Sequence, residues 1–208
     1  MIRRISSYAA LLLMAAVAGG AQAAGDTKAG FDKSALCHGC HGEQGYAIAP
    51  NFPNLAGQKS GYIVKQVTDF QKNHRYNDTM SPMAAAVGTK QDLYDIAAYF
   101  SSQKAMKAMI PGSDKKKIDQ GKKIYEKGNP RTGLYGCLNC HGNKGMGKSP
   151  NNHVFPVLGG QNKDYLVQQL NDFRAGSRKN DPAGMMVDIA KKLSEAELDA
   201  VTEYLSSL

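Results

Sequence analysis

The chain has 208 residues, 42% of them apolar, and a formal net charge of +8. This length allows one domain or two small ones, and the composition allows packed cores and excludes a low-complexity chain. Only four cysteines and five histidines occur, so the way they are grouped carries most of the chemical information.

The first 24 residues are typical of a secretory signal peptide. Arg3 and Arg4 precede an apolar run over residues 8–17, and an Ala-x-Ala cleavage site ends near Ala23 or Ala24. The apolar run is too short to span a bilayer comfortably, which argues against a membrane anchor. We therefore expect these residues to be removed and the mature chain, with a net charge of +6 after loss of the two arginines, to lie in the periplasm.

Two short motifs contain all four cysteines. Residues 37–41 read Cys-His-Gly-Cys-His and residues 137–141 read Cys-Leu-Asn-Cys-His. The pattern C-x-x-C-H is the attachment sequence for c-type haem. Two thiols at i and i+3 lie on one side of a short helix and can reach the two vinyl groups of one porphyrin, and the next residue presents its imidazole to the iron. The sequence therefore predicts two covalently bound haem c groups. The expected thioether residues are Cys37, Cys40, Cys137 and Cys140, and the expected axial histidines are His41 and His141.

Other uses of C-x-x-C pairs fit less well. In an oxidising compartment four cysteines are also compatible with two disulfides, a redox dithiol or a zinc site. The histidine directly after the second cysteine of both motifs argues against these alternatives. His38 occupies a spacer position where the second motif has Leu138, so we expect it to ligate nothing.

The motifs belong to a repeat of a whole domain, and the segments that follow them match at an offset of 103 residues. The matched pairs include Phe52 with Phe155, Pro53 with Pro156, Gln58 with Gln161, Tyr62 with Tyr165, Gln66 with Gln169, Phe70 with Phe173 and Arg75 with Arg178.

Each half is predicted to be helical. Apolar periodicity predicts helices over residues 58–73 and 163–175, a capping box at Ser194–Glu197 predicts the start of the last helix, and nothing alternates as a strand. The expected fold is all-α, a tandem duplication with one domain over residues 25–101, a polar linker over 102–119 and a second domain over 120–208. Gly30 and Gly121 are expected near the start of the first helix of each domain.

Methionines before the last helix of each half are candidates for the sixth iron ligand. Met80 precedes Val87 by seven residues and Met186 precedes Leu193 by seven, so the repeat favours Met80 and Met186. Their neighbours Met83 and Met185 remain alternatives; His74 and His153 fit the repeat less well. A thioether ligand stabilises ferrous iron, which raises the potential, and it leaves no open position for a substrate.

Each axial imidazole also needs a partner for its second ring nitrogen. A proline follows each motif at a comparable distance, so the carbonyls of Pro53 and Pro156 are candidate acceptors. Both prolines are equally compatible with a role as turn residues only.

Taken as a set, the two C-x-x-C-H motifs, the Pro-x-Leu-x-Gly-Gln segments after them and the methionine before each last helix resemble the diheme cytochromes of the c4 type. The resemblance implies two class I cytochrome c folds about a pseudo-twofold axis, with the haems near the interface. It implies a periplasmic electron carrier, loosely held at the membrane, that takes electrons from a bc-type complex or a dehydrogenase and feeds a terminal oxidase. No nucleic-acid partner is expected.

Two other functions stay open at this point. One is the haem-bearing subunit of a periplasmic dehydrogenase of the flavocytochrome type, and the other is a catalytic diheme cytochrome, against which a methionine in both halves argues. Charge also distinguishes the halves. Residues 25–101 carry seven basic and seven acidic residues, and residues 102–208 carry seventeen and eleven, a net of +6. We expect the second half to face acidic or anionic surfaces.

Overall fold

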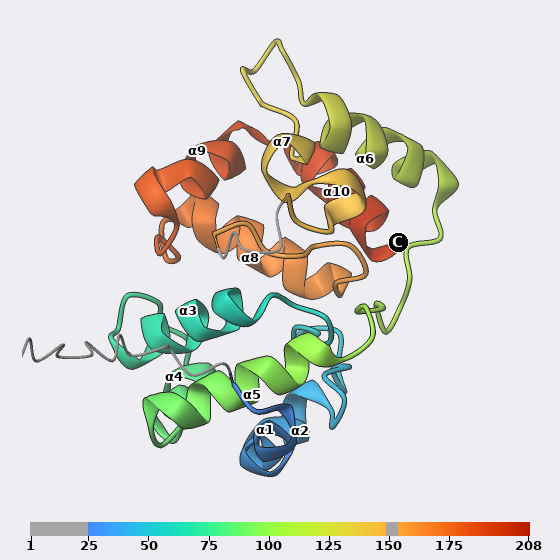
Figure 1. Cartoon of the computed structure of the whole chain (residues 1–208). Helices are drawn as coiled ribbons and strands as arrows, with labels where there is room; N and C mark the ends of the chain where they lie inside the picture. The colour runs from blue at the N-terminus through green and yellow to red at the C-terminus, as the bar shows by residue number, and fades with distance from the viewer. Residues whose placement is uncertain (1–24, 149–153) are drawn as a thin grey trace, which may run out of the picture.

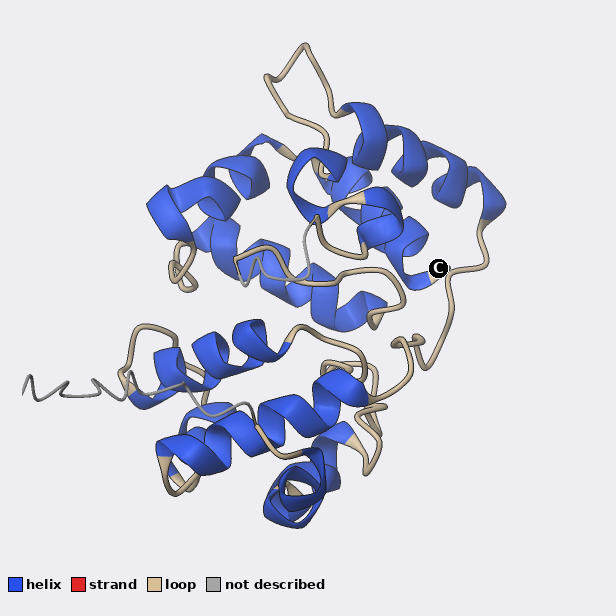
Figure 2. Cartoon of the chain, in the orientation of Figure 1, coloured by secondary structure: helices blue, strands red, loops and turns tan. Residues whose placement is uncertain are grey.

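The structure, a computed structural model, describes residues 25–148 and 154–208. The expected signal peptide and His153 lie outside these residues. In the described ranges the chain contains helices and loops and no strand, with one isolated bridge between Asn129 and Leu134 (Figure 2). The all-α fold predicted from the sequence is confirmed. No helix in these ranges is long and apolar enough to cross a membrane.

Each half contributes α-helices in the same order (Figure 1). The first half contains α1 (Thr27–Lys33), α2 (Ala35–His41), α3 (Ser60–Gln71), α4 (Met80–Ala85) and α5 (Lys90–Ser102). The second half contains α6 (Lys115–Lys127), α7 (Leu138–His141), α8 (Lys163–Ala175), α9 (Met185–Lys192) and α10 (Glu195–Ser206). Two 3-10 turns, η1 (Asn143–Gly145) and η2 (Pro182–Gly184), follow α7 and precede α9. The correspondence of α1 with α6 through α5 with α10 is what a duplicated domain requires.

The first and last helices of each half cross at a glycine. A Cβ on Gly30 of α1 would lie 2.0 Å from the carbonyl oxygen of Asp95 in α5, and a Cβ on Gly121 of α6 would lie 1.9 Å from that of Ala200 in α10. The two backbones therefore approach more closely than any side chain allows. This close crossing explains why a glycine occurs at the equivalent position of each half.

Both last helices begin with a capping box. In α10 the hydroxyl of Ser194 accepts from the N–H of Glu197, whose carboxylate accepts from the N–H of Ser194, as the sequence predicts. In α5 Thr89 and Asp92 form the same pair. The last helix of each half thus starts at an equivalent position.

The segment between the halves is packed rather than free. Met106 is 5% exposed and Ala108 is 4% exposed, and the side-chain amide of Asn54 donates to the carbonyl of Lys107 at 2.9 Å. Helix α6 begins at Lys115, inside the stretch expected to be linker, because the Asp114 carboxylate caps it by accepting from the N–H of Lys117. The observed connection between α5 and α6 is therefore residues 103–114.

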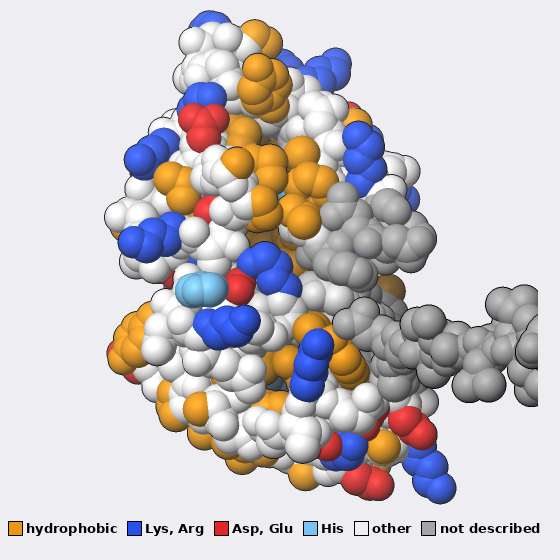
Figure 3. Space-filling model, turned by 60° about the vertical axis from the view of Figure 1, so that its left-hand side comes forward, with side chains coloured by type: hydrophobic (Ala, Val, Ile, Leu, Met, Phe, Trp, Pro, Cys, Tyr) orange, Lys and Arg blue, Asp and Glu red, His pale blue; other side chains and the backbone are white. Residues whose placement is uncertain are grey.

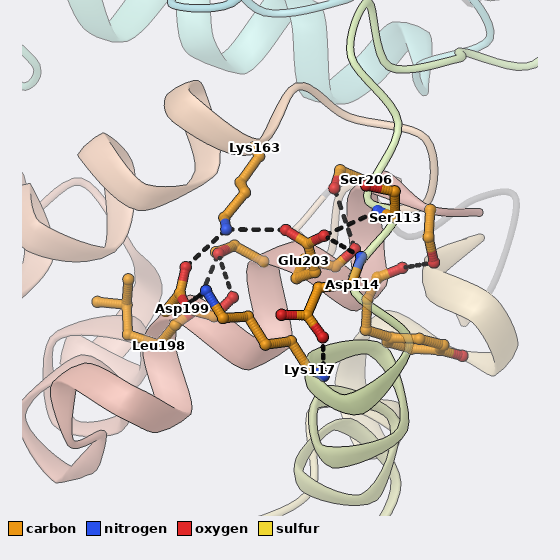
Figure 4. Close-up of polar contacts among 11 residues, drawn as sticks. Ser113, Asp114, Lys117, Lys163, Leu198, Asp199, Glu203 and Ser206 are labelled. Atoms are coloured by element: carbon orange, nitrogen blue, oxygen red, sulfur yellow. Dashed lines mark hydrogen bonds and ion pairs between the residues drawn. The ribbon is translucent and has the colours of Figure 1, made fainter.

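The end of this connection is fixed to the second half by a cluster of charged side chains (Figure 4). One carboxylate oxygen of Glu203 accepts from the N–H groups of Ser113 and Asp114 at 2.8 and 3.0 Å, and the other accepts from Lys163 at 2.8 Å. Lys163 also pairs with Asp199 at 2.6 Å. Bonding to Lys163 lowers the pKa of Glu203, so the carboxylate stays ionised at neutral pH and the anchor persists.

The two halves meet where α3 and α8 lie side by side (Figure 1). Each of two arginines there donates to a glutamine of both halves and to a tyrosine of the opposite half. The residues are Arg75, Arg178, Gln66, Gln169, Tyr62 and Tyr165. Each guanidinium also lies over the matched phenylalanine of its own half, at 4.7 and 4.4 Å from the ring centroids. This pairing about a pseudo-twofold axis fixes one relative placement of the halves.

Candidate functional site

The cysteines and the following histidine of each motif share a short helix. Cys37, Cys40 and His41 lie on α2. Cys140 and His141 lie on α7, and Cys137 is the N-cap residue of that helix. All four cysteines are half-buried.

Both motif histidines are buried and hold one ring nitrogen against a proline carbonyl. His41 is 8% exposed and its Nδ1 lies 2.9 Å from the oxygen of Pro53; His141 is 6% exposed and its Nδ1 lies 3.1 Å from that of Pro156. A carbonyl only accepts, so Nδ1 carries the proton in each ring and Nε2 is left without a proton, in the form that can bind a metal. The two prolines are therefore acceptors for the histidines, which decides between the two roles that the sequence left open.

The surroundings keep these imidazoles neutral. Burial lowers the pKa of His41 and His141, an effect that the proline carbonyls oppose only in part. Phe52 and Phe155 pack edge-on against the two rings, with centroids 6.4 and 6.2 Å apart. A neutral, oriented imidazole is the form that ligates a metal.

The methionines differ in exposure in a way that separates the candidates. In the first half Met80 is half-buried and packs, like Cys37, against the hydrophobic core, whereas Met83 is 38% exposed. In the second half Met186 is half-buried and Met185 is 38% exposed. A ligand must face the interior, so burial favours Met80 and Met186 over their neighbours.

Side chains before α4 and α9 fix the start of each methionine segment. The N–H of Met80 donates to the Asn77 side chain at 2.8 Å, and the N–H of Met186 donates to the Asp181 carboxylate at 2.7 Å. The side chain of His74 is 65% exposed and faces Asp69 at 3.9 Å, which does not suit a buried iron ligand.

His38 has a structural environment of its own. Its Nε2 lies 2.8 Å from the hydroxyl of Ser34, and its ring packs against Phe31 and Phe100, with centroids 5.6 and 6.3 Å away. These contacts account for the histidine at the spacer position.

The residues of each half fit a covalently attached haem. Two thiols sit on one short helix beside an imidazole with a free Nε2, and a half-buried thioether is available from another segment of the same half. Among the described residues, no group of three or more His, Cys, Asp or Glu side chains is arranged to hold a metal ion. On the face in Figure 3, hydrophobic side chains gather in the second half, with a smaller group in the first half below.

Comparison with known proteins identifies the family. The family model described as cytochrome c matches residues 118–208. A cytochrome c4 of Thiocapsa roseopersicina is 43% identical over 186 residues, which cover 88% of this chain and 93% of the relative. The chain belongs to the cytochrome c4 family.

A solved structure and a second relative extend this result. The crystal structure of reduced recombinant cytochrome c4 from Pseudomonas stutzeri superposes with a TM-score of 0.80 at 39% identity, covering 89% of this chain and all of that one. A thiosulfate dehydrogenase electron acceptor of Stutzerimonas stutzeri is 36% identical over 184 residues, or 88% of this chain and 83% of the relative. As a member of the cytochrome c4 family, the chain is a diheme electron carrier with two covalently attached haem c groups.

The motif cysteines, histidines and methionines stand out in the sequence, but the side chains that join the two halves next to the motif histidines do not. Gln58 and Gln161 stand out in the sequence only as a repeated letter after each Pro-x-Leu-x-Gly segment. The one sequence feature that could have identified these glutamines is that a polar residue recurs next to apolar residues that are buried. The role of the glutamines, however, depends on how the two halves pack.

Proposed function

We propose that the chain is a periplasmic electron carrier in a respiratory chain, with each haem ligated by one histidine and one methionine. The proposed thioether residues are Cys37, Cys40, Cys137 and Cys140, the proposed axial histidines are His41 and His141, and the proposed sixth ligands are Met80 and Met186. The proposed domains are the two helical halves, expected over residues 25–101 and 120–208; α5 and α6 extend them to Ser102 and back to Lys115.

The observation that carries this proposal is the matched pair of buried histidines, His41 and His141, each with Nδ1–H donated to a proline carbonyl. The arrangement fixes the tautomer and the ring orientation that axial ligation requires. The same arrangement occurs in both halves, which supports two equivalent haem sites rather than one functional site and one that has lost its function.

The chain's own residues then have separate tasks. Bound haem supplies a one-electron ferric–ferrous couple. The two thiols of each motif would hold the haem covalently, the buried histidine would offer its Nε2 to the iron, and the methionine would offer its thioether sulfur. Thioether ligation raises the potential, which suits a carrier that delivers electrons to an oxidase.

Ligation is tested by single substitutions read in the near-infrared. The oxidised protein should show the weak sulfur-to-iron band with an intensity that corresponds to two sites. Met80→Ala and Met186→Ala should each remove about half of it, and the matched variants Met83→Ala and Met185→Ala should leave it unchanged. A band that survives Met80→Ala and is halved by Met83→Ala would show that the wrong neighbour is assigned.

The proposed acceptor is a terminal oxidase, and the proposed donor is a bc-type complex or a dehydrogenase. Export by the signal peptide places both exchanges in the periplasm, with peripheral association at the membrane. The identity of the acceptor is tested by adding the purified, reduced carrier to membranes that contain the oxidase but lack the carrier, and measuring oxygen uptake. The result that opposes the proposal is oxygen uptake that is the same with and without added carrier.

A second candidate rests on one comparison. The relative named thiosulfate dehydrogenase electron acceptor supports a role beside a periplasmic dehydrogenase, as its haem-bearing electron-transfer subunit. Isolation at low ionic strength separates the candidates. A dehydrogenase that co-purifies at a constant ratio supports the subunit role, whereas a chain that purifies alone and reduces an oxidase supports the mobile carrier.

A further inference from the structure

Two buried glutamines bond across the interface between the halves. The side-chain amide of Gln161 accepts from the N–H of Asn54 at 2.8 Å and donates to the carbonyl of the same residue at 3.0 Å. The amide of Gln58 does the same to Val157, at 3.0 and 2.9 Å. Gln58 is 4% exposed and Gln161 is 3% exposed. The two glutamines are matched in the repeat, so the contacts form a reciprocal pair about the pseudo-twofold axis.

The bonded peptides are the ones that hold the motif histidines. The N–H of Asn54 and the carbonyl of Pro53 are two ends of one peptide group, and that carbonyl accepts from His41 at 2.9 Å. The N–H of Val157 and the carbonyl of Pro156 likewise share one peptide group, and this carbonyl accepts from His141 at 3.1 Å. A continuous hydrogen-bonded chain therefore runs from the glutamine of one half, through a peptide, to the histidine of the other half.

We propose that Gln161 and Gln58 are positioning residues that tune the haem of the opposite half: Gln161 acts on the first haem through His41, and Gln58 acts on the second through His141. The inference rests on the proposed axial role of these histidines. It makes the interface between the halves a part of both redox sites, rather than only a contact that holds them together.

The physical reason is cooperative polarisation. Hydrogen bonds in a chain strengthen one another, and the effect is larger where water is excluded. A peptide whose N–H donates to a glutamine has a more negative carbonyl oxygen, which pulls more strongly on the Nδ1–H of the histidine. The imidazole then becomes a more basic ligand and stabilises ferric iron. Removing the glutamine should therefore raise the potential of the haem in the other half.

A neighbouring amide offers a matched control. Asn162 is 1% exposed, and its side chain also crosses the interface, donating to the carbonyl of Phe52 at 2.9 Å. The peptide that carries this carbonyl ends at the nitrogen of Pro53, which has no N–H and takes no part in the chain to His41. Asn162→Leu therefore weakens the interface without weakening the peptide that holds the histidine.

The experiment compares Gln161→Leu, Gln58→Leu and Asn162→Leu in the full-length holoprotein. Haem methyl resonances, assigned to each half, are followed by NMR through a redox titration, and the Nδ1 proton of each axial histidine is observed in the reduced protein. In Gln161→Leu the ferrous-to-ferric ratio of the first haem at a fixed potential should rise about two- to fivefold, which is about 18 to 41 mV at 59 mV per tenfold for one electron.

The expected pattern is crossed. Gln161→Leu raises the potential of the first haem and shifts the Nδ1 proton of His41, Gln58→Leu does so for the second haem and His141, and Asn162→Leu moves neither. If a leucine variant does not take up haem, Gln161→Asn and Gln58→Asn, which keep a polar amide one methylene short of the peptide, replace it with the same expected direction.

Three results would overturn the inference: a shift confined to the variant's own half, equal shifts of both haems, or shifts no larger than those of Asn162→Leu. These results differ from a failure of the proposed function. If the unsubstituted protein lacks the near-infrared band of His/Met haem, the assignment of the ligands fails; if the band is present and the shifts are not crossed, only the role of the glutamines fails.

Discussion

Replacing Gly121 by alanine tests the helix crossing that holds the second haem domain together. The added Cβ would lie 1.9 Å from the carbonyl oxygen of Ala200 and 2.8 Å from the Cβ of Tyr204. Ordinary contacts begin at 3.4 Å, so α6 and α10 would have to separate by about 1.5 Å. The obstacle is backbone, which cannot rotate away as the end of a flexible side chain can.

The expected cost follows from two opposed effects. Overpacking of this kind costs about 1–3 kcal/mol and occasionally more. Alanine regains up to about 1 kcal/mol of helix propensity over glycine. Because α10 also buries Tyr204 and Leu205, we expect the upper end of the cost and a net loss of about 2 kcal/mol in the free energy of unfolding. For a domain of this size the unfolding midpoint should fall by about 8–16 °C.

The assay is thermal unfolding of the holoprotein, followed by far-ultraviolet circular dichroism and by the haem absorption. Gln120→Ala, at an exposed position one residue earlier in α6, is the control and should change the free energy of unfolding by less than about 0.5 kcal/mol. A midpoint for Gly121→Ala that is equal to or above that of the unsubstituted protein would show that the crossing of α6 and α10 tolerates a Cβ, since helix propensity alone predicts that outcome.

Two further predictions concern charge. Hydrogen bonds to Lys33 and Thr89 lower the pKa of Asp92 from 3.8 to about 2. The carboxylate therefore stabilises the folded state above pH 3.8, and this contribution is lost as pH falls towards 2. Acid unfolding of Asp92→Asn should lack this pH dependence, and an acid-unfolding profile identical to that of the unsubstituted protein would contradict the prediction. Electron transfer with a partner that uses the basic second half should slow as ionic strength rises from about 10 to 200 mM, where the Debye length falls from about 30 Å to under 10 Å. Charge reversal at residues 115–117 should reduce this salt dependence in stopped-flow measurements. If the rates with every physiological partner do not change with salt, electrostatic steering does not contribute to docking.

The local chemistry of each half could be predicted from the sequence. The spacing of Cys37, Cys40 and His41 depends only on helix geometry, and the same is true of the second motif. The capping box at Ser194 and the helix over residues 163–175 also follow from local pattern, and the structure has both. These features need no knowledge of how distant segments pack.

Features that depend on packing between the halves could not be predicted. The segment around Met106 contains lysines and a proline and reads as a solvated linker, yet Met106 is buried and its sulfur lies 3.6 Å from the side-chain nitrogen of Gln161 in the second half. Lysines 115–117 belong to α6 because Asp114 supplies an N-cap, a signal that the lysine run hides in the sequence. Gln58 and Gln161 are polar residues whose partners lie about a hundred positions away, so no local rule assigns them.

The choice among methionines lies between these cases. As candidate iron ligands, the repeat favours Met80 over Met83 and Met186 over Met185. The favoured methionine of each pair is also the more buried one in the structure. The second half contains η2 before α9, with Ala183 at φ 54° and Gly184 at φ 69°, where the first half has a direct start of α4. This extra turn explains why spacing alone assigns the second methionine less directly than the first.

A visible and near-infrared redox titration of the purified protein tests directly whether both haems have closed His/Met sites. Such sites predict two c-type haems per chain, both low-spin in the oxidised and reduced states, a sulfur-to-iron band with the intensity of two sites, and no binding of added carbon monoxide or azide. A single haem per chain, or a high-spin haem that binds either ligand readily, would contradict a carrier with two closed His/Met sites.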